Sequence, residues 1–267
     1  MNRTLSLFAG FCLLAHFSPA QFTILGADAF GRANSLVAVP GYSSIYQNPA
    51  GIGADTSGFL AFNYLKTVPV QGFHTTGVQG VFIGNGFNFG FSIDSFGDRH
   101  YRESRAGLAL ARKQDRVSLG IKMSYVGMHS AGMGSRKAFL GELGMVVMPV
   151  SRVSLGLSLI NFTSARFSGS RPFPVVLALG AALHPNPRIS LSGQLDYRLS
   201  GKPVVRLGLH YQVRDQLGFS AGINPEMHSV HFGAHVRAGR YRFLYGISTH
   251  PYVGIAHHTT FIYQLHD

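Results

Sequence analysis

From residue 58 onward, apolar and polar residues alternate along the chain with a period of two. In VSLGIKMSY (117–125) every second residue is apolar, and the residues between them are Ser, Gly and Lys. The same alternation recurs in ISLSGQLDYRL (189–199) and VRLGLHYQV (205–213). Because successive side chains of a β-strand point to opposite faces, the pattern predicts a sheet with one apolar and one polar face.

Turn-forming residues between the apolar runs mark about 14 strands of roughly ten residues. This is about the length that a tilted strand needs to cross a bilayer. The predicted strands span residues 58–66, 71–83, 86–95, 102–112, 116–127, 137–148, 152–162, 174–184, 188–199, 203–213, 215–223, 228–238, 240–249 and 257–265.

The connections between the predicted strands alternate in length. Short ones such as GNG (84–86) and PNP (185–187) are followed by longer ones such as SFGDRHY (95–101) and FTSARFSGSRPF (162–173). Short turns on one side, longer loops on the other and an even number of strands are typical of outer-membrane barrels. Strands of a soluble β-sandwich also alternate apolar and polar residues, but that fold does not require short turns at one end and longer loops at the other. The fold class expected is all-β, an antiparallel transmembrane β-barrel of about 14 strands.

Composition supports export to an outer membrane. After the first twenty positions of the 267-residue chain there is no run of about 18 apolar residues, which excludes a helical membrane protein. Residues 1–20 have a basic start, an apolar stretch and small residues at a cleavage site, the pattern of a signal peptide. Cys12, the only cysteine, lies in this segment, so the mature chain is expected to have no disulfide.

The formal net charge of +12 points to an anionic partner. Nucleic acid, anionic lipid and acidic proteins all qualify, and export argues against nucleic acid. In or beside the expected outer loops, basic side chains would meet lipopolysaccharide phosphates or simply be solvated. They are Arg99, Arg102, Arg136, Lys137, Arg166, Arg171 and Lys202.

One segment, GYSSIYQNPAGIG (41–53), fits neither a core strand nor a long helix. Proline pushes the preceding Asn48 toward extended geometry, and the Asn48 side chain can cap a short turn that Pro49 begins and Gly51 ends. Residues 26–53, with a Gly/Ala-rich lead and then Asn48-Pro49-Ala50-Gly51, resemble the N-terminal signature of the FadL-like outer-membrane barrels. That group includes the PorV/PorQ-type proteins of Bacteroidetes type IX secretion.

The resemblance implies that the N-terminal segment folds inward and fills part of the lumen. Together with the signal-peptide pattern and the strand alternation, it divides the chain into a signal peptide (1–20), a plug-like segment (21–57) and a barrel (58–267). It also implies a function, that of a non-enzymatic accessory subunit of a surface-protein secretion or assembly machine, with other outer-membrane or periplasmic proteins as partners. The alternative that the resemblance implies is a FadL-like passive transporter of small hydrophobic molecules.

Basic residues on the predicted lumenal face form the second candidate site. They are Arg105, Lys122, Arg198, Arg206, Arg237 and Arg242. One interpretation is an anion-selective or plug-binding interior. The favoured interpretation is a lumen wall in which these cations bond to Asp94, Glu142, Asp196 and plug carbonyl groups.

The sequence contains no motif for catalysis or for a cofactor. His231 and His235 share a strand face, but four residues of strand separate them by about 13 Å, too far for one ion. No Ser, His and Asp are spaced as a hydrolase triad, and GNGFNFG (84–90) lacks dinucleotide-binding spacing. We therefore expect no enzyme activity, no cofactor and no metal site.

Overall fold

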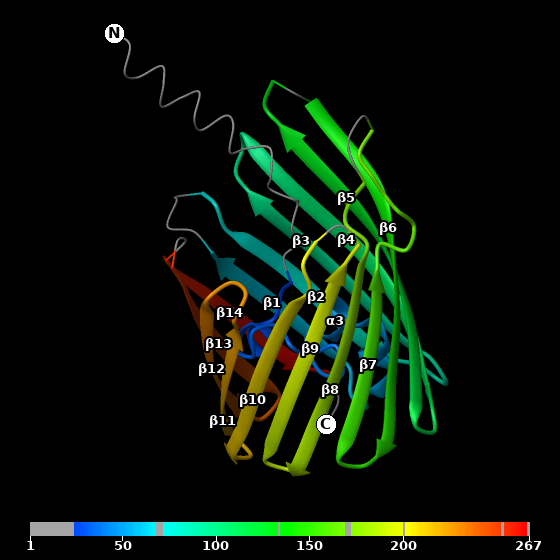
Figure 1. The fold of residues 1–267 in the computed structure, drawn as a ribbon, viewed down its shortest axis with the longest axis vertical. Helices are drawn as coiled ribbons and strands as arrows, with labels where there is room; N and C mark the ends of the chain where they lie inside the picture. Colours follow the sequence, from blue (N-terminus) through cyan, green and yellow to red (C-terminus); the bar gives the residue numbers. More distant parts are fainter. Residues whose placement is uncertain are drawn as a thin grey trace.

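The computed structural model describes residues 24–67, 72–132, 134–168, 172–199, 201–251 and 254–265. Its strands form one closed barrel in which each strand pairs antiparallel with its neighbours in sequence, and β1 pairs with β14 (Figure 1). The predicted 14-stranded antiparallel barrel is confirmed. The predicted signal peptide and Arg171 lie outside the described residues.

The strands of the barrel are β1 (Phe59–Lys66), β2 (Thr75–Ile83), β3 (Asn88–Gly97), β4 (Tyr101–Gln114), β5 (Val117–Ser130), β6 (Gly134–Val150), β7 (Val153–Ile160), β8 (Val176–Asn186), β9 (Ile189–Arg198), β10 (Val204–Arg214), β11 (Leu217–Asn224), β12 (Ser229–Ala238), β13 (Tyr241–His250) and β14 (Gly254–Gln264).

The two ends of the barrel differ. At one end, here called the turn end, the strands are joined by residues 84–87, 115–116, 151–152, 187–188, 215–216 and 239–240. The opposite end, here called the loop end, carries the connections 67–74, 98–100, 131–133, 161–175, 199–203, 225–228 and 251–253. In Figure 1 the turns lie at the bottom.

Several strand boundaries differ from the prediction. The predicted strand 71–83 begins only at Thr75, and the predicted strand 257–265 already begins at Gly254. The long loop expected between the fifth and sixth strands is wrong, because β5 and β6 stay in register up to the pair Ser130 and Gly134. Backbone pairing continues there beyond the apolar stretch that was used to mark the strand ends.

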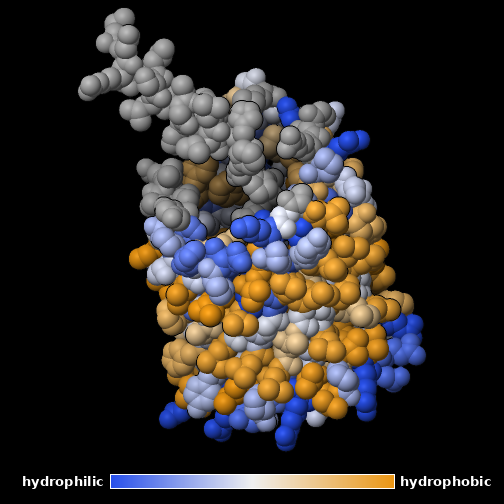
Figure 2. Space-filling view, in the orientation of Figure 1, coloured by the Kyte–Doolittle hydropathy of each residue, from blue (hydrophilic) through white to orange (hydrophobic). Residues whose placement is uncertain are grey.

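The outer surface of the barrel is an apolar belt. Figure 2 shows this belt as an orange zone with hydrophilic residues toward both ends. Leu119 on β5 is 56% exposed, whereas the preceding Ser118 is 2% exposed because it faces inward. A lipid-facing apolar wall around a polar interior is the arrangement of a transmembrane barrel and inverts that of a soluble protein.

The N-terminal segment lies inside the barrel and is hereafter called the plug (residues 24–57). It contains α2 (Ala27–Gly31), α3 (Ser44–Gln47) and the 3-10 helix η2 (Pro49–Ala54). Its apolar side chains, among them Phe30, Ile45 and Ile52, are buried in one cluster with inward residues of the wall. Among the described residues, no helix combines the length and the apolar character needed to span a bilayer.

Paired glycines of the wall let the plug backbone approach closely. Gly120 on β5 lies opposite Gly144 on β6, and Gly156 on β7 lies opposite Gly180 on β8. A Cβ atom on Gly120 would lie 2.5 Å from the backbone of Pro49 and Ala50, and one on Gly156 would lie 2.6 Å from Cα of Ala38. Only glycine leaves room for main chain to pack on main chain here.

Candidate functional site

Asn48 joins the plug to the wall. Its backbone is extended (φ −159°), and its Oδ1 accepts a hydrogen bond of 3.0 Å from the Ala50 N–H, which caps η2. Its Nδ2 lies within hydrogen-bond distance of three carbonyl oxygens, those of Val37 (2.7 Å), Met145 (3.1 Å) and Leu157 (3.2 Å). One buried side chain therefore connects two parts of the plug with β6 and β7.

The rest of the motif packs on β5 and β6. Pro49 is the first residue of η2, where its missing N–H costs no hydrogen bond. The Ala50 carbonyl accepts a hydrogen bond of 2.6 Å from the Ser118 hydroxyl. The turn does not end at Gly51, as the sequence predicted, but continues to Ala54 because the Asp55 N–H bonds to the Ile52 carbonyl.

Three of the six predicted lumenal cations lie buried in ion pairs. Arg105 contacts Asp94 at 3.2 Å, Lys122 contacts Glu142 at 3.7 Å, and Arg206 bonds to Asp196. The Lys122 ammonium group also donates a 2.8 Å hydrogen bond to the plug carbonyl of Ile45. Arg105 and Lys122 each lie 5.1 Å from the ring centre of Tyr46 in the plug.

The other three predicted cations lie in different surroundings. Arg198 is half-buried at the loop end, and no hydrogen bond or ion pair joins its side chain to another described residue. Arg237 lies at the turn end, where its Nε donates a 3.2 Å hydrogen bond to the Gly239 carbonyl. Arg242 lies under the plug, 5.2 Å from the ring centre of Tyr42.

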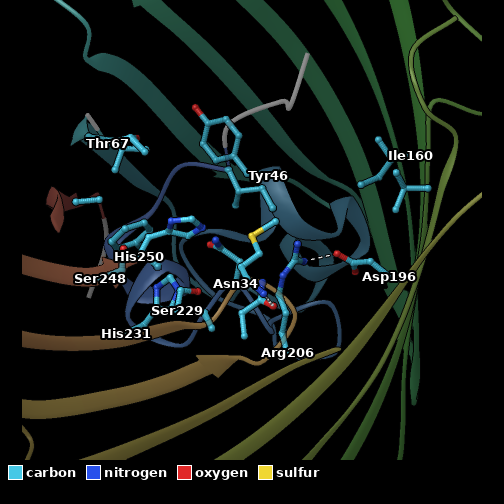
Figure 3. Close-up of a pocket in the computed structure, with 18 of the residues that line it drawn as sticks. Asn34, Tyr46, Thr67, Ile160, Asp196, Arg206, Ser229, His231, Ser248 and His250 are labelled. Carbon is cyan, nitrogen blue, oxygen red and sulfur yellow. Dashed lines mark hydrogen bonds and ion pairs between the residues drawn. The ribbon is translucent and has the colours of Figure 1, made fainter. Parts of the chain in front are cut away.

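A cavity of about 480 Å³ lies on the loop-end side of the plug and is here called the outer cavity. Figure 3 shows Asn34, Tyr46, His231 and the Arg206–Asp196 pair around this space. Its wall is mixed. Apolar side chains include Ile24, Phe30, Leu65, Ile160, Val176 and Met227, and charged ones are Arg105, Glu142, Asp196, Arg198 and Arg206. Such a wall can accept a small apolar or amphipathic molecule.

Part of the loop between β7 and β8 lies over the inner face of β5 and β6. Phe167 and Phe173 meet edge to face at 4.8 Å and are buried with Val126 and Leu140. Asn161 closes this loop, because its Nδ2 donates a 2.8 Å hydrogen bond to the Phe173 carbonyl. The loop thereby brings Pro174 to the outer cavity.

Helix α2 lies on the opposite side of the lumen from the Asn48 motif. The Gly26 N–H donates to His258 Nε2 at 3.2 Å, and the Ala27 N–H donates to Thr260 Oγ1 at 2.9 Å. The Phe30 ring contacts the rings of His231 and His258 edge to face, at 5.2 and 5.4 Å. These β14 residues were not predicted as plug ligands, although strand alternation places His258 and Thr260 on the inward face.

A second cavity of about 160 Å³ lies on the turn-end side of α2 and is here called the inner cavity. It lies between the plug and β10 to β13. Its lining includes Asp28, Arg32, Tyr42, His210, Gln212, His235 and Arg242. Phe30, Ala33 and Asn34 line the outer cavity, so α2 and the residues after it separate the two cavities.

Two charged groups of the plug have shifted pKa values. Burial raises the pKa of Asp55 to about 8, and the nearby Asp28 carboxylate raises it further. Asp55 Oδ2 is buried and has no hydrogen-bond partner in the described part of the chain. Burial also lowers the pKa of Arg32, against the opposing effect of Asp28. Asp55 is therefore a plug residue that changes charge near neutral pH.

No group of three or more metal-binding side chains occurs among the residues that the structure describes. His231 and His258 both pack on Phe30, and His235 stacks on His210 at 5.3 Å, so these histidines lie in two separate contacts. No Ser–His–Asp arrangement was found in the hydrogen bonds of the described chain. The site thus consists of a plug between two cavities.

The comparisons with known proteins agree with this architecture. Neither a protein-family model nor a curated protein matches the chain by sequence. Among solved structures, the CymD monoaromatic hydrocarbon channel superposes with a TM-score of 0.69 at 11% identity, over 91% of this chain and 98% of that one. The Pseudomonas putida toluene transporter TodX has a TM-score of 0.65 at 12% identity, over 89% and 96%. A Pseudomonas aeruginosa FadL homologue has a TM-score of 0.59 at 14% identity, over 91% and 98%.

These likenesses define the class of the fold. The chain is a closed 14-stranded β-barrel similar to FadL-type outer-membrane channels over most of its length. At these identities the likeness establishes the fold alone. Two of these structures are a channel and a transporter by name. The PorV/PorQ-type assignment made from the N-terminal signature receives no support from the three similar structures.

Proposed function

We propose that this protein is a non-enzymatic outer-membrane channel that passively transports small hydrophobic molecules. The observation that carries the proposal is the outer cavity, which has an apolar side and lies above a plug in a barrel with an apolar belt. We place the turn end at the periplasmic side and the loop end at the cell surface, because outer-membrane barrels have short periplasmic turns. The alternative function from the sequence is thus preferred over the secretion-accessory function.

The size of the outer cavity suits a small solute. A volume of about 480 Å³ is in the usual range for small-molecule sites. Contact with Phe30, Leu65 and Val176 favours an apolar molecule, because burial removes its surface from water. The paired charges of Arg206 and Asp196 leave little net field at the base of the cavity.

The route past the plug is proposed to run along α2. The outer and inner cavities meet α2 from opposite sides, and β10 to β13 form the wall beside it. Movement of α2 would connect the cavities, because α2 has one cavity on each side. Solute would therefore leave the outer cavity near Phe30 and reach the periplasmic side near Arg242.

Uptake of radiolabelled toluene by cells with a lipopolysaccharide-containing outer membrane tests this function. Cells that make the protein should take up toluene faster than cells without it. Ser248→Trp places a large ring in the outer cavity, and we expect it to lower uptake several-fold. Thr249→Trp is the matched control, since Thr249 is the exposed neighbour on the same strand.

Uptake equal in producing and non-producing cells would refute the transport function. So would an equal effect of the two tryptophan variants at equal amounts of folded barrel. If the protein instead co-purifies with surface-protein export machinery and its loss disturbs surface proteins, the accessory function would be favoured.

A further inference from the structure

The inner cavity has chemistry that hydrophobic transport does not require. Two arginines, Arg32 and Arg242, line a space of about 160 Å³, together with His210, His235 and Gln212. Asp28 is the acidic residue of this lining. Counting the histidines as neutral, the cavity has an excess of positive charge. Its small volume excludes a long hydrophobic chain.

Asp28 does not neutralise Arg242. Its carboxylate accepts a hydrogen bond from the Ser43 hydroxyl within the plug. Arg32, which belongs to the same turn, contacts Asp28 through a 3.4 Å hydrogen bond from Nε to the Asp28 carbonyl oxygen. Arg242 has the Tyr42 ring as its neighbour instead, and none of the salt bridges among the described residues includes it.

Two donors in this cavity lack acceptors. Arg242 Nε and His235 Nε2 are both buried from solvent, and neither has a hydrogen-bond partner among the residues that the structure describes. A buried polar group without a partner costs about 1–3 kcal/mol, so such groups in a cavity call for a ligand or water. His210 Nε2 is not the missing partner of these groups, because it already contacts Gln212 Oε1 at 3.2 Å.

We propose that the inner cavity is a binding site for a small oxyanion, a carboxylate or phosphate group, held between Arg242 and His235. One anion oxygen accepts from the Arg242 guanidinium, and another accepts from His235 in its Nε2–H tautomer. Charge-assisted hydrogen bonds of this kind are shorter and stronger than neutral ones. The positive charge of Arg32, which also lines this cavity, adds to the attraction for an anion.

The site lies toward the turn end of the barrel. His210 and Gln212 precede the turn 215–216, whereas His235 and Arg242 flank the turn 239–240. Helix α2 separates it from the outer cavity. An anion can therefore reach the site without passing the plug, and its binding does not depend on transport.

Isothermal titration of the detergent-solubilised full chain with sodium acetate, and separately with sodium phosphate, tests this site. Ionic strength is held constant with sodium chloride, so that general screening is the same in every titration. We expect saturable binding of at least one of the two anions. Arg242→Gln should weaken it at least tenfold, and His235→Phe should weaken it while keeping a ring on His210.

The matched control is Arg152→Gln, which removes an exposed arginine at the turn end outside this cavity. It should leave the affinity unchanged. Retention of the heat-modifiable folded band by each variant separates lost binding from lost folding. Binding of acetate alone, or of phosphate alone, would define which oxyanion group the site takes.

The proposal would be overturned if neither anion gives saturable heat beyond that of chloride. It would also be overturned if both Arg242→Gln and His235→Phe, still folded, bind with the wild-type affinity. Because the solubilised protein is titrated, a failure of toluene uptake in cells would leave this result unaffected.

Discussion

The two sides of the plug are held in different ways. On one side, the backbone of residues 37–51 packs against the glycine pairs of β5 to β8. Asn48 there donates to carbonyl groups of both β6 and β7. On the other side, the backbone of Arg32 and Ala33 also packs on a wall glycine, Gly222. Here, however, the plug bonds to His258 and Thr260 through two N–H groups, and α2 has a cavity above and below it. The flanking cavities indicate that α2 has more room to move than the Asn48 side, which anchors the plug.

Removal of the plug should have the largest effect. A chain lacking residues 26–53 should show a conductance in planar bilayers many times that of the intact protein, because the segment fills the lumen between the two cavities. This comparison requires that the shortened chain still forms a folded barrel, as measured by its heat-modifiable band in gel electrophoresis. A large steady conductance of the intact protein would contradict occlusion by the plug.

Side chains added to the glycine pairs should break the anchored side. Gly120→Ala and Gly156→Ala drive a methyl group into plug backbone, and overpacking of this kind costs about 1–3 kcal/mol. Urea titration of the folded barrel measures the loss. Gly246→Ala beside α2 should cost less, since its Cβ would lie 3.0 Å from the Phe30 ring edge and 3.2 Å from the Ala27 carbonyl oxygen. Equal costs would remove the difference between the two sides.

Outward-facing Gly193 provides the reference for these variants. A Cβ atom there would meet only the Leu207 side chain at 3.5 Å, so Gly193→Ala should be nearly neutral. A cost for Gly193→Ala similar to that for Gly120→Ala would mean that strand flexibility, not the plug, is being measured.

Truncation of the anchoring side chain should come next. Asn48→Ala removes the cap of η2 and leaves three carbonyl groups without this donor. We expect a loss of about 2 kcal/mol in unfolding free energy. Asn48→Asp keeps the cap acceptor but sets a carboxylate oxygen against the same three carbonyl oxygens, so it should cost at least as much as Asn48→Ala. An Asn48→Ala variant as stable as the wild type would refute the anchoring role.

Loosening α2 should cost less stability and change motion more. Thr260→Val removes the acceptor of the Ala27 N–H at similar volume, with an expected cost of about 1 kcal/mol. Hydrogen exchange at Ala27 should become faster, and brief conductance openings should become more frequent. Exchange that accelerates equally at Ala50 would mean that the plug moves as one body.

A pH dependence of stability, gradual over several pH units, is expected through Asp55. A raised pKa in the folded state means that the stabilising contribution is complete below the unfolded value and is lost as pH rises toward about 8. Unfolding free energy should therefore fall from pH 5 to pH 8, by on the order of 1 kcal/mol per pH unit. Asp55→Asn should flatten this slope. A slope that is unchanged in Asp55→Asn would assign the dependence to other groups.

Strand alternation was sufficient to predict the barrel, because one face of each strand lies on the apolar outer surface and the other faces the polar interior. Leu119 and Ser118 show this in adjacent positions. The same rule found the inward direction of Arg105, Lys122 and Arg206. Alternation could not predict that Arg206 forms an ion pair whereas Arg198, in the outer cavity, has no ion-pair partner among the described residues. Side-chain partners depend on the neighbouring strands and on the plug.

The plug contacts were harder to predict for a different reason. Asn48-Pro49 specifies a local cap, which propensity can reveal. The partners of Gly26 and Ala27 lie 232 and 233 residues away, and no local pattern joins them. Nothing in the local sequence around His258 indicates that its side chain is the acceptor for a plug N–H.

The position of these last two acceptors bears on how the chain assembles. β14 pairs with β1 to close the barrel, and it also carries His258 and Thr260. The first residues of the plug thus receive their wall partners only when the last strand to be synthesised arrives. Loop-closure entropy makes such distant contacts late and slow to form. Barrel closure and the attachment of α2 to the wall are therefore one step of folding. If the strands closed into a barrel first, the plug would have to enter the closed lumen afterwards.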